Sequence, residues 1–400
     1  MKTLNKTPYN GRMKFFLLPI LLTFILLSST LSAAEQNDLN ASEELSFFSE
    51  DGNLDLSQYL SQAYGFLPVP IIITEPAIGY GGGAALVYLH DKFVGHKGVS
   101  GRNIPPSMSG IILAGTENGT KIAGGFHLGY YLEDTLRTQT FFMLTDVNIN
   151  FYTPAEQALF MNLKSPIAYQ SFKYRLGESD IFAGVSYLYT SSELKLNREE
   201  DKTFLKEPFK VTSAALGLIL DYDTRDNALS PNQGMLFNAR ANFFSESFGS
   251  DNTFQKYFFQ ELLYVPLTEK INLDHRFVFD RVVGEEAPFY MYPAVNMRGV
   301  PAMRYQGENV ALYEAQVTYD LNARWSAVLF GGVARAYGER RNLLGKENIS
   351  FSDASTVVSK GAGFRYLIAE KFGLRMGIDV AVSNEDKAFY IQFGTAWMGL

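Results

Sequence analysis

The residues of this chain that could do chemistry are four histidines, two groupings of arginine with carboxylates and one glycine-rich run. The chain has no cysteine, which excludes disulfides, thiolate metal sites and cysteine catalysis. The histidines, His90, His96, His127 and His275, show no metal-ligand spacing, and no G-x-S-x-G nucleophile motif is present. We interpret each histidine as a turn, rim or lumen residue and expect no metal and no cofactor. A serine–histidine site assembled from distant strands stays open.

The first arginine–carboxylate grouping contains Asp223, Arg225 and Asp226, with Pro231 and Gly234 behind them. Paired carboxylates can serve acid–base catalysis. Nothing in the sequence places a substrate beside them, whereas proline and glycine supply the dihedral angles of a tight turn. We therefore predict a strand end and a turn here.

The second grouping is Arg298-Gly299-Val300, near the middle of the long segment 285–309, followed by Glu314. Glu314 lies on the mostly polar face of the next predicted strand, because successive side chains of a strand point to opposite sides. Arg298 and Glu314 can meet only if the segment folds back over the sheet. The alternative is a surface arginine, whose contribution to stability is near zero.

The glycine-rich run from Gly79 to Ala84 matches the loose G-x-G-x-x-(G/A) dinucleotide pattern. That motif requires a helix after it. Ala85 to Leu89 follows instead, with strand propensity, so nucleotide binding is excluded and the glycines are interpreted as sites of bending or close packing.

Residues 1–34 read as a secretory signal peptide, in which basic residues precede an apolar run and Ser32-Ala33-Ala34 offers a cleavage site. A membrane anchor is the alternative, but Pro19 and a Ser/Thr cluster interrupt the apolar stretch that it needs. Removing four basic residues leaves 31 Lys and Arg (35 less 4) against 42 Asp and Glu, a net charge of −11. This acidic balance excludes a nucleic-acid-binding role.

Residues 35–66 are interpreted as a short polar periplasmic leader, with a helix within 54–64. The segment 66–76 holds three prolines and is predicted to be extended rather than a strand interior. The leader is too short for an independent domain, so 67–400 is expected to be one domain without a separate periplasmic domain before it.

Fifteen runs with period-two alternation follow. Bacterial single-chain barrels have an even number of strands, so we predict sixteen strands, with fourteen as the alternative. No helix-period segment is available to cover such a sheet, which favours an all-β, antiparallel transmembrane β-barrel in the outer membrane. The predicted strands are 78–90, 108–117, 120–133, 137–152, 168–177, 181–195, 210–225, 235–248, 253–266, 271–283, 309–321, 324–337, 357–368, 371–383 and 388–397.

The C-terminal strands carry polar residues on their predicted lumen face and an aromatic pattern at the end of the chain. Arg365, Arg375 and Asp379 are expected to face the lumen. Phe393 and Trp397 place aromatic side chains near the end of the chain, which finishes with Leu400.

Residues 210–400 resemble the bacterial surface antigen family, the superfamily of BamA, TamA and the two-partner secretion transporters. The matching pieces occur in the family's order. They are Asp223-Thr224-Arg225-Asp226 with Pro231 and Gly234, then Met297-Arg298-Gly299-Val300, which is similar to a V-R-G-F motif, then Glu314, and last Ser359 to Arg365 with Gly373-Leu374-Arg375 and Asp379.

The resemblance implies a sixteen-stranded barrel whose arginine loop folds inward before the last five strands, with Arg298 paired to Glu314. It also implies translocation or insertion of a protein or lipid client, without enzymatic activity, after export through the signal peptide. The expected partners are outer-membrane lipid and, during biogenesis, the barrel assembly machinery and periplasmic chaperones. A plugged or narrow passive pore and a barrel-embedded hydrolase of envelope lipids are the alternatives.

This chain departs from the family pattern at four places. It ends in Leu400, whereas the family's assembly signal usually ends in an aromatic residue, so Phe393 and Trp397 are interpreted as this signal instead. Val300 stands where the family has phenylalanine. The region Leu329 to Val333 has glycines where an aspartate usually faces the arginine. The sequence also leaves no room for the family's periplasmic POTRA domains, so we expect a member that lacks them.

Overall fold

The computed structural model describes residues 46–49, 52–92, 104–152, 158–196, 208–342 and 345–397. The chain divides into two units, 1–45 and 46–400, and every described residue belongs to the second. The predicted signal peptide, His96 and Leu400 lie outside the described residues. Among the described residues, no helix combines the length and apolar character needed to cross a membrane.

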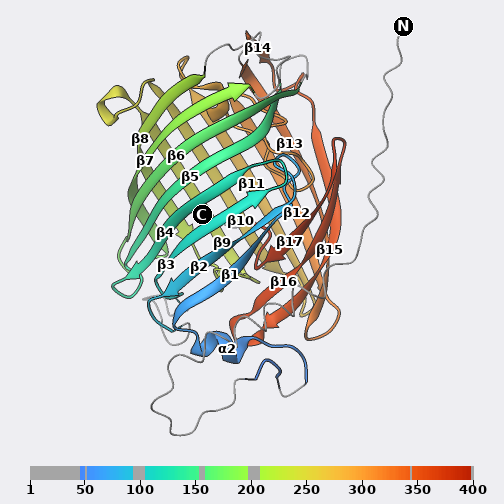
Figure 1. Ribbon diagram of the computed structural model, residues 1–400. Coiled ribbons are helices and arrows are strands. Elements are labelled where there is room, and N and C mark those ends of the chain that lie inside the picture. The colour runs from blue at the N-terminus through green and yellow to red at the C-terminus, as the bar shows by residue number, and fades with distance from the viewer. Residues whose placement is uncertain are drawn as a thin grey trace. The chain divides into compact units, whose positions relative to one another are not determined.

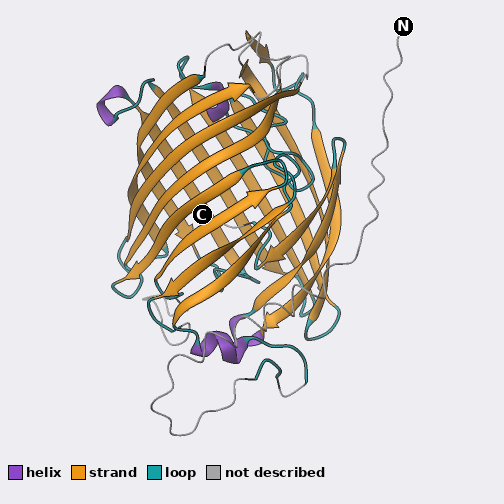
Figure 2. Cartoon of the chain, viewed as in Figure 1, coloured by secondary structure: helices purple, strands orange, loops and turns teal. Residues whose placement is uncertain are grey.

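The described residues form one antiparallel sheet of sixteen strands that curls into a nearly closed barrel, β1 to β13 and β15 to β17 (Figures 1 and 2). The sixteen-stranded all-β prediction is confirmed. Each barrel strand pairs with the next barrel strand in sequence, and β14 pairs with the extracellular end of β13. The strands are β1 Gly65–Ile73, β2 Gly81–Leu89, β3 Met108–Thr116, β4 Lys121–Tyr131, β5 Leu136–Tyr152, β6 Ala158–Arg175, β7 Ile181–Leu196, β8 Phe209–Asp223, β9 Gly234–Phe244, β10 Phe254–Pro266, β11 Ile271–Val283, β12 Asn309–Asp320, β13 Trp325–Asn342, β14 Gly345–Ile349, β15 Val357–Ala369, β16 Leu374–Ser383 and β17 Lys387–Phe393.

The two faces of the wall differ in polarity as a transmembrane barrel requires. In β8, Leu216, Leu218 and Leu220 point outward and are exposed, whereas Asp221 and Asp223 point inward and are buried. Outward apolar side chains contact lipid, and inward polar side chains contact other polar groups in the lumen. This alternation, read from sequence, is what the period-two runs predicted.

The end of the barrel that carries helix α2 (Ser57–Gln62) is taken as the periplasmic end. An even number of strands returns the chain to the side where it began, and β17 finishes at the same end where β1 starts. The longest connection, 284–308, is at the opposite end, and long loops are extracellular in such barrels.

Several predicted strand bounds are wrong by more than three residues. The strand predicted at 235–248 ends at Phe244, before the 3-10 helix η2 (Glu246–Phe248), and the strand predicted at 324–337 continues to Asn342. The segment 66–76 was predicted not to be a strand interior, but it contains β1, which tolerates Pro68 and Pro70 because it pairs on one side only. The strand predicted at 168–177 begins ten residues earlier as β6, where Pro166 had masked the pattern. The strand predicted at 388–397 ends at Phe393.

A seam separates the first strand from the last. Among the described residues, β1 pairs only with β2 and β17 pairs only with β16. Near the extracellular end of the seam, the Tyr80 ring stacks on the Phe389 ring at 5.6 Å between centroids. An unpaired edge in a bilayer is costly, because its backbone groups have no water to bond.

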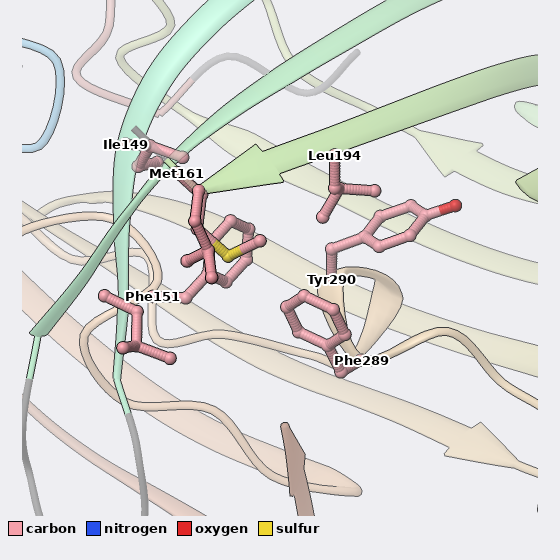
Figure 3. Packing of buried hydrophobic residues seen from close by; sticks show 8 residues of the cluster. Ile149, Phe151, Met161, Leu194, Phe289 and Tyr290 are labelled. Atoms are coloured by element: carbon pink, nitrogen blue, oxygen red, sulfur yellow. The ribbon is translucent and has the colours of Figure 1, made fainter. Parts of the chain in front are cut away.

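The connection 284–308 is packed inside the barrel at its extracellular end. Its short 3-10 helix η3 (Phe289–Met291) places Phe289 and Tyr290 among buried residues of β5, β6 and β7. Figure 3 shows these two rings pointing toward Met161 and Leu194. The predicted inward fold of this loop is confirmed.

The segment before β1 docks on the periplasmic rim. Asp55 Oδ2 accepts a hydrogen bond of 2.7 Å from Arg324 Nη1, and both side chains are buried. Leu56 N donates to Ile368 O, and the Ser57 hydroxyl accepts from Lys371 N. The helix predicted within 54–64 is present as α2.

Candidate functional site

The centre of the candidate site is the loop motif around Arg298, which lies deep in the lumen against β15, β16 and β17. Gly299 has a φ of +83°, a conformation that glycine adopts without strain. Gly299 N donates to the Tyr390 hydroxyl at 2.9 Å, and its carbonyl accepts from Ser383 Oγ at 2.6 Å. Ser359 donates to the Arg298 carbonyl. The backbone of the motif is therefore fixed by the last three strands.

The Arg298 side chain pairs chiefly with Asp379 of β16. Arg298 Nη1 is 2.8 Å from Asp379 Oδ2 and donates to Gln316 Oε1 at 3.0 Å. The predicted partner Glu314 is more distant, with 3.7 Å between Arg298 Nε and Glu314 Oε1, and Glu314 makes its shorter pair with Arg276 at 3.0 Å. Arg298 and Glu314 therefore belong to one network, in which Asp379 is the nearer partner.

Asp379 is the most enclosed member of this network. It is fully buried, and Arg365 of β15 donates to both of its oxygens at 2.6 and 3.0 Å. A Cβ at Gly363 would lie 2.0 Å from Asp379 Oδ1, so glycine leaves the space that the carboxylate occupies. Asp379 therefore provides, from β16, the carboxylate partner of the arginine that is absent from the region Leu329 to Val333.

Aromatic rings cover the remaining faces of the Arg298 guanidinium. Its carbon lies 3.6 Å from the centre of the Phe330 ring and 5.5 Å from that of Trp397. Trp397 does not continue the last strand, because Gly394, with a φ of +73°, turns the chain inward. Trp397 is buried against Leu236, Leu262 and Tyr264. Phe393 stays on the wall and is half exposed on the outer face.

Val300 anchors the loop in an apolar cluster despite lacking the family's phenylalanine ring. It is 3% exposed and packs with Val295, Met297 and Leu312. Two further contacts hold the loop from other sides. Glu75 of the β1–β2 connection accepts from Ala302 N at 3.1 Å, and Arg304 pairs with Glu385 at 2.9 Å.

The first grouping, around Asp223, is a structural turn with a buried ion pair. Arg225 donates to both oxygens of Asp223, at 2.9 and 3.2 Å, and both side chains are buried. Asp226 Oδ1 accepts from two turn amides, Asn232 N and Gln233 N. Gly234 has a φ of +98°, and Pro231 is buried in the same turn. The ion pairs of the two groupings are separate, because Arg225 bonds Asp223 whereas Arg298 bonds Asp379.

Residues that sequence reasoning missed extend this ion pair along the lumen wall. Arg137 is 3.7 Å from Asp223 and 2.5 Å from Asp134, and Arg175 is 2.7 Å from Asp134. The pairing register of the strands brings these side chains together, and their spacing in the sequence does not predict it. Arg375, predicted to face the lumen, donates to Asn232 Oδ1 at 2.9 Å. Among the described residues, no three acidic or histidine side chains converge as metal ligands.

The three histidines that the structure describes occupy two places on the outer wall. His90 and His127 lie together at the periplasmic ends of β2 and β4 and share Ser109 as a hydrogen-bond partner. His275 of β11 packs near Tyr313, with 5.8 Å between ring centroids.

Comparison with known families identifies the barrel. The model of the Omp85 superfamily domain matches residues 125–397, which is more than half of the chain. The chain belongs to the Omp85 superfamily. The match covers both groupings of arginine with carboxylates and confirms the resemblance drawn from the C-terminal half. No curated protein matches the chain.

Two solved Omp85-type barrels have the same fold at low sequence identity. BamA from Haemophilus ducreyi, solved without its POTRA domains 1–3, aligns with a TM-score of 0.53 and 13% identity, covering 80% of this chain and 68% of that one. CdiB from Escherichia coli aligns with a TM-score of 0.54 and 8% identity, covering 81% of this chain and 61% of its own. At these identities the likeness shows the fold alone.

Proposed function

We propose that this Omp85 barrel moves or inserts a protein or lipid client at the outer membrane, with the seam between β1 and β17 as the point of exit. The observation that carries the proposal is the unpaired seam beside a lumen that is filled by loop 284–308. A passive pore needs a clear lumen, whereas a lateral route needs only a wall that opens. The proposed partners are outer-membrane lipid, the client and, during biogenesis, the barrel assembly machinery and periplasmic chaperones.

The loop supports this proposal because it joins the seam to the lumen. Tyr390 of β17 holds the Gly299 amide, and Glu75, next to β1, holds the Ala302 amide. Both strands that border the seam are therefore tied to the same loop. A shift of the loop changes the support of both edges, which gives the lumen a way to influence the seam.

The two edges of the seam differ in their capacity to pair. Ile71 turns its carbonyl toward β2, since a Cβ built on Gly82 would lie 3.2 Å from that oxygen. Neighbouring residues of a strand alternate in this direction, so Pro68 and Pro70 face the seam. Neither has an N–H to donate. We infer that a client strand pairs more readily with the β17 edge.

A locked seam tests the proposed route. The chain has no cysteine, so Tyr80→Cys with Phe389→Cys introduces a single possible intramolecular disulfide, at the aromatic contact that crosses the seam. The probe is a second, urea-unfolded copy of this chain, and the readout is the rate at which it reaches the heat-modifiable folded form in vesicles containing the wild type. We expect acceleration by wild type, its loss on oxidation of the double-cysteine variant and its return on reduction.

Controls separate the seam from general damage. Each single-cysteine variant under the same oxidant should accelerate folding as the wild type does. If the oxidised double variant works normally, the seam is not the route. If wild type gives no acceleration over empty vesicles, the insertion activity is refuted and the passive-pore alternative takes its place.

A further inference from the structure

An outward-facing cluster at the periplasmic ends of β2, β3 and β4 is separate from the lumen network. The strand registers place Tyr88, Ser109 and His127 side by side in one row. Ile111 and Leu113, two and four residues after Ser109, are more than half exposed on the same face. Ser109 and His127 therefore face lipid rather than the lumen. Ionisable residues on a membrane-facing wall are costly, which marks them as candidate functional groups.

The cluster is a continuous chain of hydrogen bonds centred on one hydroxyl. Ser109 Oγ lies 2.8 Å from His127 Nδ1 and 2.8 Å from His90 Nε2. On its far side, His127 Nε2 lies 2.7 Å from the Tyr131 hydroxyl. The two imidazole rings are 5.5 Å apart and nearly perpendicular. A serine hydroxyl between two imidazole nitrogens is the arrangement in which a base can remove its proton.

The proton inventory allows a consistent direction along this chain. A neutral imidazole donates from one nitrogen and accepts at the other. When Ser109 donates to His127 Nδ1, His127 donates from Nε2 to the Tyr131 oxygen and His90 donates from Nε2 to Ser109 Oγ. Each group then has a distinct position, with a base on one side of the nucleophile and an N–H donor on the other.

We propose that Ser109 is the nucleophile of a lipid acyl-ester hydrolase on the outer wall of the barrel, with His127 as its general base. The nucleophile–base distance lies within the range that such catalysis uses. Tyr131 is a positioning residue that fixes the His127 ring, and His90 supplies an N–H for the developing oxyanion. This activity is independent of the proposed client route through the seam.

The reaction balances with water as its only co-substrate. His127 Nδ1 takes the Ser109 proton while Oγ bonds to the ester carbonyl carbon, and the carbonyl electron pair moves to its oxygen, where the His90 N–H stabilises the charge. The bond to the glycerol oxygen then breaks, and His127 returns the proton to that oxygen. Water from the periplasm attacks the acyl-serine by the same sequence, releasing a fatty acid and restoring the hydroxyl.

The position of the cluster sets the substrate class. Tyr64, Phe66 and Tyr131 are exposed at the same end of the outer wall. Aromatic residues at this level mark the boundary between the lipid headgroups and the acyl chains. The ester bonds of a glycerophospholipid lie at that boundary. The substrate is therefore a phospholipid of the periplasmic leaflet.

Covalent labelling tests the nucleophile directly. The full chain, reconstituted in phosphatidylethanolamine–phosphatidylglycerol vesicles, is treated with a fluorophosphonate probe and the labelled residue is mapped by mass spectrometry. We expect label on Ser109, its loss in Ser109→Ala and at least a tenfold slower reaction in His127→Gln. Ser107→Ala is the matched control, because the Ser107 hydroxyl bonds backbone atoms of Tyr130. That variant should label like wild type.

Hydrolysis of the vesicle phospholipid is the second readout. Removing the nucleophile or the base should lower the release of fatty acid about a hundredfold or more. Tyr131→Phe should lower kcat and leave KM unchanged, which a purely structural tyrosine would not do. Folded wild type that neither reacts with the probe nor releases fatty acid overturns the proposal. Label that persists in Ser109→Ala, or in wild type and His127→Gln at equal rates, overturns it as well.

Discussion

The buried ion pair of Asp379 and Arg298 depends on the residues packed around it. The carboxylate is fully buried and accepts hydrogen bonds from Arg298 and Arg365, while Gly363 leaves space beside it. Burial removes the water that would otherwise solvate these charges, so each charge depends on its partner. A change at either residue leaves the other charge buried without its compensation.

Loss of one partner is therefore expected to destabilise the barrel strongly. Asp379→Ala should lower the free energy of unfolding by about 3 kcal/mol or more, because it leaves Arg298 and Arg365 uncompensated. Arg298→Ala should have a similar effect, and Glu314→Ala a smaller one, since Glu314 lies 3.7 Å from Arg298. Urea titration of heat-modifiable, folded protein in lipid vesicles measures the difference. A larger loss of unfolding free energy in Glu314→Ala than in Asp379→Ala would show that Glu314 is the more important partner of Arg298.

Strand β1 shows how two residues can keep an element from completing a sheet. Pro68 and Pro70 remove two donors from the edge that faces β17, and β17 is a short strand of seven residues. Proline on an edge strand commonly prevents unwanted pairing. Here we expect it to keep the barrel from closing, so that its effect is on the whole wall rather than on one strand.

Restoring the donors is expected to strengthen the seam. In Pro68→Val with Pro70→Val, the new amides can pair with β17, and hydrogen exchange across 65–73 should slow at least several-fold. The same variant should accelerate folding of the unfolded probe less than wild type. Pro166→Val in β6 is the control, because it lies away from the seam. Unchanged exchange in the double variant would mean that proline does not hold the edges apart.

The docked segment before β1 has a dependence on pH that follows from Asp55. Burial by itself raises the pKa of the Asp55 carboxyl, but hydrogen bonds from Ser57 and Arg324 outweigh it and hold the pKa below the ordinary value of 3.8. A lowered pKa in the docked state stabilises docking above pH 3.8, and this contribution is lost as the pH falls through the lower, docked value.

Docking is therefore expected to weaken in acid and to be insensitive to pH near neutrality. A spin label on a cysteine at Gln62 should become more mobile below about pH 3.8. Asp55→Asn should make the label mobile at pH 7 and remove the acid transition. A label whose mobility in wild type stays constant from pH 7 to pH 3 would rule out Asp55 as the group that controls docking.

At the scale of the whole molecule, the loop fills the lumen of the barrel, and the unpaired seam between β1 and β17 is the weakest part of its wall. Loop 284–308 is bound by residues on the connection before β2, on β12 and on the last three strands. The lumen is thus occupied by the protein's own chain. Passage along the barrel axis requires this loop to move, while passage through the seam does not.

Electrical measurements distinguish these routes. In planar bilayers the wild type should be quiet, and Arg298→Ala should show open or noisy conductance because the loop loses its pair with Asp379. Arg335→Ala is the matched control, since Arg335 bonds Thr356 and Phe351 near the extracellular end. A steady unitary conductance that is identical in wild type and Arg298→Ala would mean that Arg298 does not hold a plug.

Local chemistry determined much of this protein from the sequence alone. Alternation of apolar and polar residues placed most strands, and the even-strand rule turned fifteen runs into sixteen strands. Parity put Glu314, Arg365 and Asp379 on the inner face, because side-chain direction in a strand depends only on position along it. Gly299 and the arginine beside it were recognisable as an inward loop through the family resemblance.

Only the tertiary structure decided which of these inner residues meet. Arg298 lies closer to Asp379 than to Glu314, and Ser109 lies within hydrogen-bond distance of both His90 and His127. Both results depend on the strand register, which sets the level of each side chain along the barrel axis and which the sequence does not state. Trp397 turns inward at Gly394, which strand alternation could not foresee. The edge role of β1 was hidden for a similar reason, since prolines forbid a central strand but permit one whose second side stays unpaired.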